Sequence, residues 1–318
     1  IFVIGLFKKV ILADSISPFA TSVFNGAEMG AAVSFSEAWL GALAYSCQIY
    51  FDFSGYSDMA IGLGRVFGIQ LPLNFNSPYK STGIIEFWRR WHMTLSRFLR
   101  DYLYIPLGGN RLGPNRRYVN MLIVMLLGGL WHGAGWNFVI WGGLHGIYLM
   151  TNHGWRSWRG TKRSDAWLAR LLSGTLTFLA VTVAWVFFRA ESFDGAIVIL
   201  SAMAGMDGIT LPNWVANVPG AGTIAAALAF ELEATYWAQP DGVMWVTGLL
   251  LLAWLLPNTQ EIMHAFMDRQ RYRIAPVRDW TRWIRWEPNL ASAAVIACIT
   301  IVAMLSLGRP SEFIYYQF

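Results

Sequence analysis

The sequence predicts an all-α polytopic membrane protein. Of its 318 residues, 55% are hydrophobic and 14% are charged, and the mean hydropathy is +0.41. Soluble domains carry about 25% charged residues, so a soluble chain of this composition would lack the polar side chains that cover a water-exposed surface. The same numbers exclude disordered and fibrous proteins. Long apolar segments, and the gathering of Lys and Arg into separate blocks, support the same class.

Five apolar segments are candidates for membrane-spanning helices, each of which needs about 20 mostly apolar residues. They are Ala38–Phe51, Tyr118–Met150, Trp167–Phe188, Val243–Leu256 and Leu290–Leu307. The first and fourth are short and need flanking residues to cross a bilayer. The chain also opens inside an apolar stretch, Ile1–Phe7, without an initiating methionine. We therefore expect a single transmembrane domain over residues 1–318 that is N-terminally truncated.

The segment Tyr118–Met150 is too long for a single span. It contains no Lys, Arg, Asp or Glu, and as one helix it would be about 50 Å long against a hydrocarbon core of about 30 Å. Basic residues flank both of its ends. Residues 118–150 are therefore predicted to form a membrane hairpin that returns to the side it entered from. Its natural break runs from Gly128 to Gly135.

The charge pattern predicts which loops face the cytoplasm, because Lys and Arg concentrate there. Residues 65–117 contain nine Lys or Arg, and Pro257–Pro288 contains six Arg, whereas Ala190–Gly242 has neither type and six acids. The first two segments are predicted to be cytoplasmic and the third external. Within 65–117, the segment Ile84–Tyr104 mixes apolar and basic residues at helical spacing. It predicts an amphipathic helix that lies at the interface or dips into the protein.

His132 is the first candidate for chemistry, because it interrupts the uncharged apolar run GGLWHGAGWNF. An ionisable group inside a membrane segment is costly and is a functional hypothesis by default. The pKa of free histidine also suits a general base near neutral pH. The alternative is a structural histidine that hydrogen-bonds a neighbouring helix.

Other polar residues have structural interpretations. His92, in the run FWRRWH, fits an interfacial histidine among Trp and Arg anchors, and His145 fits a packing role. Asp58 is expected to cap the next helix, whereas Asp52 is expected to have a polar role inside the bundle.

Arginines around position 100 allow two interpretations. They could face anionic lipid headgroups as surface anchors, or dock a phosphate-bearing donor such as a coenzyme A thioester. They are Arg89, Arg90, Arg97 and Arg100.

Several classes of function are excluded. The sequence contains no GxSxG, HExxH or Walker motif, and no histidine or cysteine spacing indicates a metal site. The net charge of +5 is modest and is distributed between apolar segments, which does not fit a nucleic-acid-binding surface.

Three motifs together resemble the membrane-bound O-acyltransferase family, in its alginate O-acetyltransferase-like bacterial branch. They are FWRRWHMTLS, RDYLYIPLGG and LWHGAGWN. The resemblance covers roughly residues 1–190. It implies a helical ring around a central tunnel, and further spans upstream of Ile1.

The resemblance also implies a site. His132 falls on the family's catalytic histidine, where it would act as general base, and His92 falls on a second family histidine with an assisting role. Five other residues are expected, from the same motifs, to line the substrate tunnel or hold its structure. They are Asp52, Arg100, Tyr102, Trp131 and Asn137.

The implied function is transfer of an acetyl group from a cytoplasmic thioester, acetyl-coenzyme A or another acyl donor, for O-acetylation of an exported, alginate-like polysaccharide. No bound cofactor is expected. The implied location is the bacterial inner membrane, in contact with lipid and with a periplasmic acetyltransferase- or esterase-like partner. The alternatives are D-alanyl transfer to teichoic acid, peptidoglycan O-acetylation, and a non-catalytic conduit for acyl groups or glycans.

Overall fold

The protein is all-α, as predicted, and its described residues include two three-residue strands. The structure is a computed structural model that describes residues 1–160, 166–206, 208–228, 230–235, 238–267 and 284–308. Most of the arginines of Pro257–Pro288, the segment predicted to be cytoplasmic, lie outside the described residues. The principal helices are α1 (Phe2–Phe7), η1 (Lys8–Ala13), α2 (Asp14–Glu28), α3 (Phe35–Val66), α4 (Ile84–Trp88), α5 (Met93–Phe98), η3 (Leu99–Tyr104), α6 (Gly113–His132), α7 (Trp136–Arg159), α8 (Trp167–Arg189), α9 (Phe193–Met203), α11 (Pro240–Leu255), α12 (Thr259–Ile262) and α14 (Leu290–Ser306).

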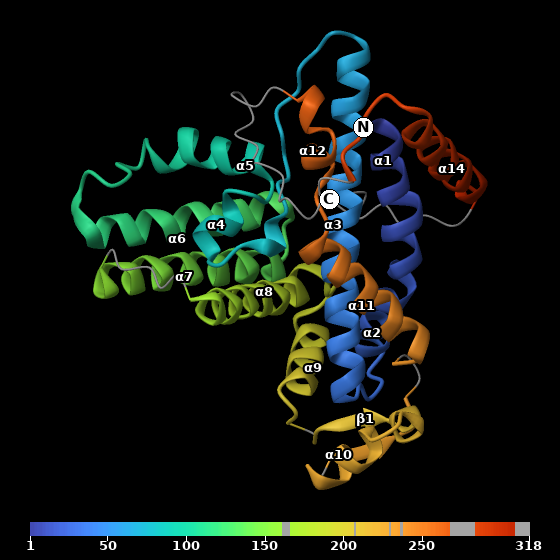
Figure 1. Cartoon of the computed structure of the whole chain (residues 1–318). Helices are drawn as coiled ribbons and strands as arrows, with labels where there is room; N and C mark the ends of the chain where they lie inside the picture. Colours follow the sequence, from blue (N-terminus) through green and yellow to red (C-terminus); the bar gives the residue numbers. More distant parts are fainter. Residues whose placement is uncertain (161–165, 207, 229, 236–237, 268–283, 309–318) are drawn as a thin grey trace.

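Helix α3 is the longest helix and organises the others. Its 32 residues give a length of about 48 Å. It begins at a capping box, in which the Ser34 and Glu37 side chains each bond the other's backbone N–H. Helices α1, α2, α8, α9 and α11 all pack against it. In Figure 1 it stands upright, while α6, α7 and α8 extend to one side.

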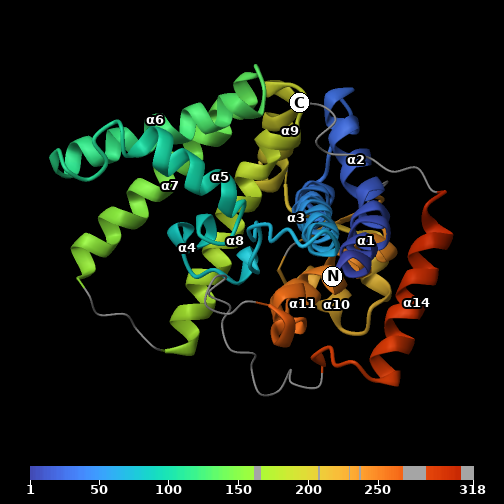
Figure 2. The same ribbon diagram turned by 90° about the horizontal axis from the view of Figure 1, so that it is seen from above.

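Helices α6 and α7 form a hairpin that is packed unusually closely. A Cβ atom on Gly129 would collide with the carbonyl oxygen of Phe138, and one on Gly142 with that of Met125. The turn, residues 133–135, falls within the glycine-rich break seen in the sequence. Figures 1 and 2 show the two helices side by side, with α8 next to α7. This hairpin carries His132 at the end of its first helix.

Helix α8 alone among the described helices is long and apolar enough to cross a membrane. Its 23 residues match the predicted segment Trp167–Phe188 with one residue added. Helices α9, α11 and α14 are apolar but have 10–17 residues. Helix α9 lies in a segment predicted as an external loop, yet it packs against α2, α3 and α8.

The predicted amphipathic helix Ile84–Tyr104 is interrupted, so this expectation is wrong in part. The backbone N–H of Asn76 donates to the carbonyl of Arg90, and that of Met93 donates to the carbonyl of Asn74. These bonds draw the chain out of the helix between α4 and α5. His92 lies at the break with a φ of 40°, in the left-handed region.

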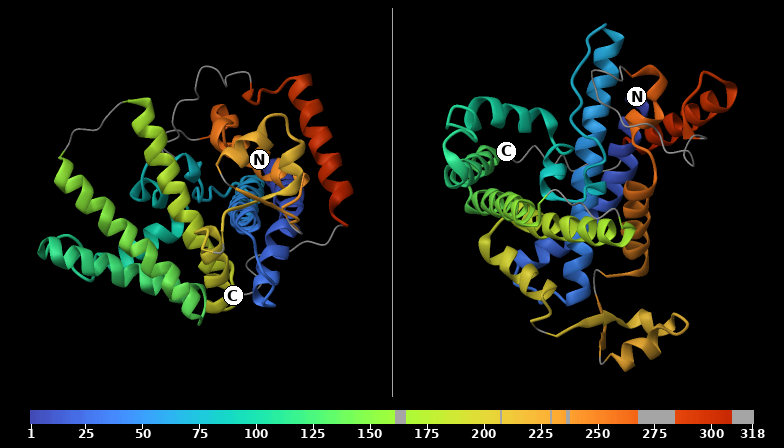
Figure 3. Two further views of the ribbon diagram at one scale, coloured as in Figure 1. Left: turned by 90° about the horizontal axis from the view of Figure 1, so that it is seen from below. Right: turned by 60° about the vertical axis from the view of Figure 1, so that its left-hand side comes forward.

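The two strands belong to a small lobe within residues 204–239. Strand β1 (Thr210–Pro212) pairs in parallel with β2 (Glu231–Glu233), and α10 (Ala221–Ala227) lies beside them. In Figures 1 and 3 this lobe lies at the opposite end of the molecule from α12.

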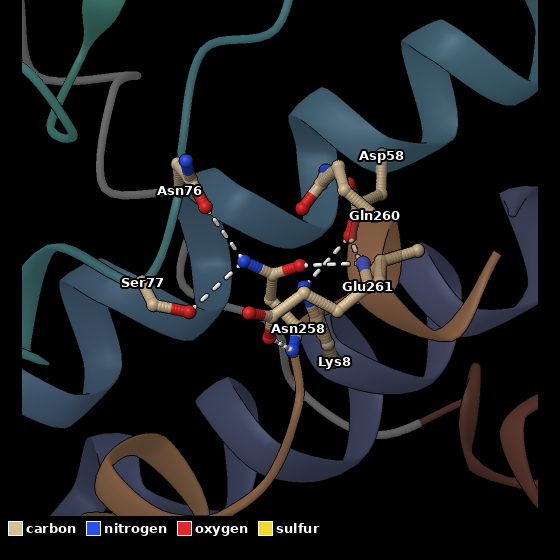
Figure 4. A network of polar contacts seen from close by, with 8 residues as sticks. Lys8, Asp58, Asn76, Ser77, Asn258, Gln260 and Glu261 are labelled. Atoms are coloured by element: carbon tan, nitrogen blue, oxygen red, sulfur yellow. Dashed lines mark hydrogen bonds and ion pairs between the residues drawn. The ribbon is translucent and has the colours of Figure 1, made fainter. Parts of the chain in front are cut away.

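A buried polar network joins α12 to the N-terminal helices (Figure 4). Asp58, in the C-terminal half of α3, receives bonds from Lys8 Nζ at 2.7 Å, Thr259 Oγ1 at 2.6 Å and Gln260 Nε2 at 2.9 Å. The expectation that Asp58 caps a following helix is therefore wrong, because α3 continues through this residue to Val66.

Candidate active site

His132 is the last residue of α6 and is 5% exposed. The chain can turn directly after it because Gly133 has no side chain: a Cβ atom there would collide with the Phe138 ring. Three aromatic rings surround the imidazole, with centroid distances of 4.9 Å to Trp131, 5.2 Å to Trp141 and 5.0 Å to Phe188. The ring is therefore enclosed by apolar faces contributed by α6, α7 and α8.

His92 comes to the same place from the break between α4 and α5. Its ring lies 6.5 Å from the Trp131 ring and 4.8 Å from Phe53 of α3. Trp131 thus contacts both histidines, which are 40 positions apart in the sequence. The structure brings together three of the predicted site residues: His92, Trp131 and His132.

The hydrogen bonds of Asn74 determine which nitrogen of His92 carries a proton. Asn74 Oδ1 accepts from the backbone N–H of Thr94 at 3.3 Å, which fixes the orientation of the amide. The same oxygen lies 3.1 Å from His92 Nδ1. Since an amide oxygen only accepts, Nδ1 must donate, and Nε2 of the neutral ring is left able to accept a proton. Sequence reasoning missed Asn74, which belongs to no motif that indicates chemistry.

Asn137 anchors the first turn of α7. Its Nδ2 donates to the carbonyl of Ala190, just beyond the end of α8, at 2.9 Å. This bond fixes the start of α7 against α8, close to the turn that follows His132. The expectation that Asn137 belongs to the substrate tunnel stays a prediction.

Asp52 lies in an ion-pair cluster at the N-terminal helices. It is 2% exposed on α3, and its Oδ1 lies 2.9 Å from Nζ of Lys9, which also pairs with Asp14 at 2.8 Å. The burial agrees with a polar role inside the bundle. The neighbouring residue, Phe53, contacts the His92 ring, so this cluster is linked to the site along α3.

Arg100 and Tyr102 lie on the exposed π-helix η3. Arg100 Nε donates to Asp101 at 2.7 Å, and this hydrogen bond lowers the pKa of the Asp101 carboxyl. Arg100 lines a cavity of about 380 Å³ together with Tyr104 and Arg111. Tyr102 is 68% exposed and packs on Phe98 at 4.9 Å. Neither residue forms part of the aromatic enclosure described above for His132.

One further residue adjoins the rings around His132. His145 lies one turn after Trp141 on α7, with the two ring centroids 4.9 Å apart. The sequence predicts a packing role for His145. Trp141 and His145 are four positions apart, so their N–H groups lie on the same face of a helix. This spacing, shortly after His132 in the sequence, is a signal that could have pointed to both residues.

No group of three His, Cys, Asp or Glu in the described part of the chain is arranged to hold a metal ion. What the site offers is a buried histidine, a second histidine in contact with the same indole, and an apolar surround. This arrangement suits proton transfer by an imidazole that is itself buried, beside an indole, Trp131, that is 62% exposed.

Comparison with known proteins identifies the family. Residues 1–190 match the membrane-bound O-acyltransferase family. The chain is 51% identical over 211 residues to the peptidoglycan O-acetyltransferase of Helicobacter pylori, covering 66% of this chain and 39% of that protein. It is 47% identical over 329 residues to a probable alginate O-acetylase of Pseudomonas putida, covering 100% of this chain and 60% of that protein.

A more distant relative is the teichoic acid D-alanyltransferase of Streptococcus thermophilus, 32% identical over 170 residues, with 51% of this chain and 41% of that protein covered. The chain thus spans about 40–60% of the length of these curated relatives. It belongs to the membrane-bound O-acyltransferase family and is a membrane protein. The resemblance drawn from the three sequence motifs is confirmed.

Proposed function

We propose that the protein transfers an acetyl group from a thioester to a hydroxyl group, with His132 as general base. One observation carries this proposal: His132 is buried among aromatic rings and shares the Trp131 indole with His92. A thioester carbonyl is already electrophilic, so the enzyme needs a base rather than its own nucleophile. General-base help of this kind supplies about 10²–10⁴-fold in rate.

In the proposed reaction, His132 takes the proton from the acceptor hydroxyl while its oxygen attacks the carbonyl carbon. The C–S bond then breaks, and the thiolate leaves with a proton returned by His132. His92 assists by accepting or passing on a proton at Nε2, because its Nδ1 donates to Asn74. The buried rings of Trp141 and Phe188 shield His132 from water, which would otherwise hydrolyse the thioester.

The acceptor is proposed to be an exported, alginate-like polysaccharide. The match to the probable alginate O-acetylase of Pseudomonas putida extends over the whole chain, including residues beyond 190. The matches to the peptidoglycan O-acetyltransferase and the teichoic acid D-alanyltransferase cover 66% and 51% of it. These two activities are the alternatives within the same chemistry.

The donor, location and partner are proposed with the function. Acetyl-coenzyme A or another cytoplasmic acyl thioester would supply the acetyl group to a multi-pass protein in a bacterial inner membrane. A periplasmic acetyltransferase- or esterase-like protein would receive the group or pass it to the polymer. The nine basic residues of 65–117 favour a donor that carries phosphate.

The test compares His132→Ala with His153→Ala at equal abundance in the membrane. His153 is a partly exposed histidine near the end of α7, so its loss controls for removing an imidazole. We expect His132→Ala to abolish O-acetylation of the exported polymer while polymer output stays normal, and His153→Ala to retain it. Full acetylation in His132→Ala would contradict the general-base assignment and favour a conduit whose partner performs the chemistry.

A further inference from the structure

Three buried ring N–H groups in the stack around Trp141 lack an acceptor among the described residues. Two lie on α7: Nε1 of Trp141, whose ring contacts His132, and Nε2 of His145. The third, Nε1 of Trp185 on α8, lies beside the Tyr79 hydroxyl. The Trp141 side chain is 2% exposed and His145 is fully buried. A buried donor without an acceptor is unfavourable, and native structures contain few of them. Such a group at a reaction site indicates a ligand atom that accepts the bond.

The partner of His145 Nδ1 fixes the proton on Nε2. Trp88 Nε1 lies 3.3 Å from His145 Nδ1. An indole nitrogen can only donate, so Nδ1 must accept. The neutral His145 ring therefore carries its proton on Nε2 and presents it as a donor.

Both rings are held rigidly. His145 stacks on Phe87 with an interplanar angle of 10°, and Trp141 stacks on Trp185 at 5.8 Å with an angle of 19°. Helix α7 is held against α6 by the contact at Gly142, one position after Trp141. Donors fixed in advance are those that stabilise charge best, because they need no reorganisation during the reaction.

Trp141 is the donor nearer to the proposed base. Its ring centroid lies 5.2 Å from that of His132 on one side and 4.9 Å from that of His145 on the other. Trp141 and His145 are neutral donors, which fits an uncharged oxygen that gains negative charge during the reaction better than a full anion.

We propose that Trp141 Nε1–H, with His145 Nε2–H as second donor, binds the carbonyl oxygen of the acyl thioester. This inference rests on the proposed function. As the hydroxyl oxygen attacks, the C=O electron pair moves onto the carbonyl oxygen, and the two N–H groups stabilise the resulting oxyanion. When the C–S bond breaks, the pair returns to re-form the C=O bond. His132 carries the proton of the acceptor hydroxyl to the leaving thiolate, and Trp141 and His145 keep their N–H protons throughout.

The first test compares Trp141→Phe with Trp185→Phe. Both changes replace a buried indole by a phenyl ring in the same stack, but the N–H of Trp185 lies beside the Tyr79 hydroxyl and is not a proposed donor. We expect Trp141→Phe to lower kcat by about 100-fold with KM for the thioester changed by less than about threefold, as for loss of an oxyanion donor. Trp185→Phe should lower kcat less than about threefold. Equal losses in the two variants would overturn the proposal.

The second test concerns His145 as a donor. His145→Gln supplies a side-chain N–H and should retain more activity than His145→Leu, which supplies none. Trp88→Phe removes the bond that fixes the proton on Nε2, so it should also lower kcat while leaving KM for the thioester nearly unchanged. If His145→Gln and His145→Leu lose equal activity at equal abundance, His145 is not a donor.

A binding measurement separates this inference from the proposed function. In the His132→Ala background, the infrared carbonyl stretch of bound ¹³C-labelled acetyl-pantetheine should lie at lower frequency than in water, and Trp141→Phe should move it back. If the frequency does not depend on Trp141, the inference fails, even where His132→Ala abolishes transfer. If His132→Ala retains full transfer, the proposed function fails first.

Discussion

Nδ1 of His92 lies 3.1 Å from Oδ1 of Asn74, and the same oxygen accepts two bonds from Thr94. The contact joins the break between α4 and α5 to the segment that follows α3. The backbone of His92 is in the left-handed region, with a φ of 40°. The bond to Asn74 orients the imidazole so that it contacts the rings of Trp131 and Phe53. The position of His92 therefore depends on backbone geometry and on one amide oxygen.

The left-handed backbone conformation at position 92 should determine how much each substitution there changes the stability of the protein. Asparagine is several-fold enriched among non-glycine residues with positive φ, so His92→Asn is expected to keep nearly the wild-type stability. His92→Val should lower the free energy of unfolding by about 1–3 kcal/mol, because a β-branched residue is strained there. Thermal unfolding of the two variants in the same detergent gives the comparison. Equal stability would show that the left-handed conformation is not required.

Removing the amide of Asn74 should affect activity more than folding. Without that acceptor, the proton of His92 is no longer fixed on Nδ1 and the ring can move. We expect Asn74→Ala to lower the rate of acyl transfer by up to about 100-fold, measured as O-acetyl groups formed on the acceptor per folded protein. The control is Asn76→Ala, whose side chain bonds Asn258 instead. If Asn76→Ala lowers the rate as much, the effect comes from disturbing the segment between α3 and α4 and not from loss of the Asn74 amide.

The sequence predicted the class of fold and the position of the α6–α7 turn from simple physics. An uncharged segment of 33 residues is too long for one span, and glycines permit the turn at 133–135. It did not predict the break at His92, because the bonds responsible come from Asn74 and Asn76, outside the segment. Periodicity within 84–104 carries no information about those partners.

For the candidate site, the sequence predicted the two histidines but not how they are brought together. A histidine within apolar residues is visible in the sequence, and the family motifs name His92 and His132. The contact of both rings with Trp131 depends on how α4, α5 and α6 pack, which periodicity does not determine. Asp58 shows the same limit: its partners Lys8, Thr259 and Gln260 are 50 to 202 positions away, so helix capping was the wrong interpretation.

The close packing of α6 on α7 predicts opposite results at two adjacent glycines. A Cβ atom on Gly142 would collide with the backbone carbonyl of Met125, whereas one on Gly143 would meet Leu126 Cδ2 at 3.5 Å, an ordinary contact. Gly142→Ala should lower the free energy of unfolding by about 1–3 kcal/mol. Gly143→Ala should be neutral or slightly stabilising, since alanine favours helix. Midpoints of thermal unfolding in detergent measure both, and a stable Gly142→Ala would refute the close contact.

Removing one partner of the Lys8–Asp58 ion pair should lower the free energy of unfolding more than removing both partners. Asp58 is 1% exposed and the Lys8 side chain 12%, so Asp58→Leu leaves a largely buried ammonium without its carboxylate. We expect a loss of about 3–5 kcal/mol in the free energy of unfolding for the single change. Lys8→Met in addition should restore part of that loss, because no unpaired charge remains. A double-mutant cycle measures the coupling, and purely additive losses would contradict it.

An exposed pair of equal length provides the control for that experiment. Arg100 Nε and Asp101 Oδ1 are also 2.7 Å apart, but the two side chains are 60% and 45% exposed. Solvent screens such a pair, so Asp101→Ala should leave the free energy of unfolding nearly unchanged. Equal losses at Asp58 and Asp101 would show that burial does not determine the strength of these contacts. A large loss at Asp58 alone would establish that the network of Figure 4 holds α12 on the N-terminal helices.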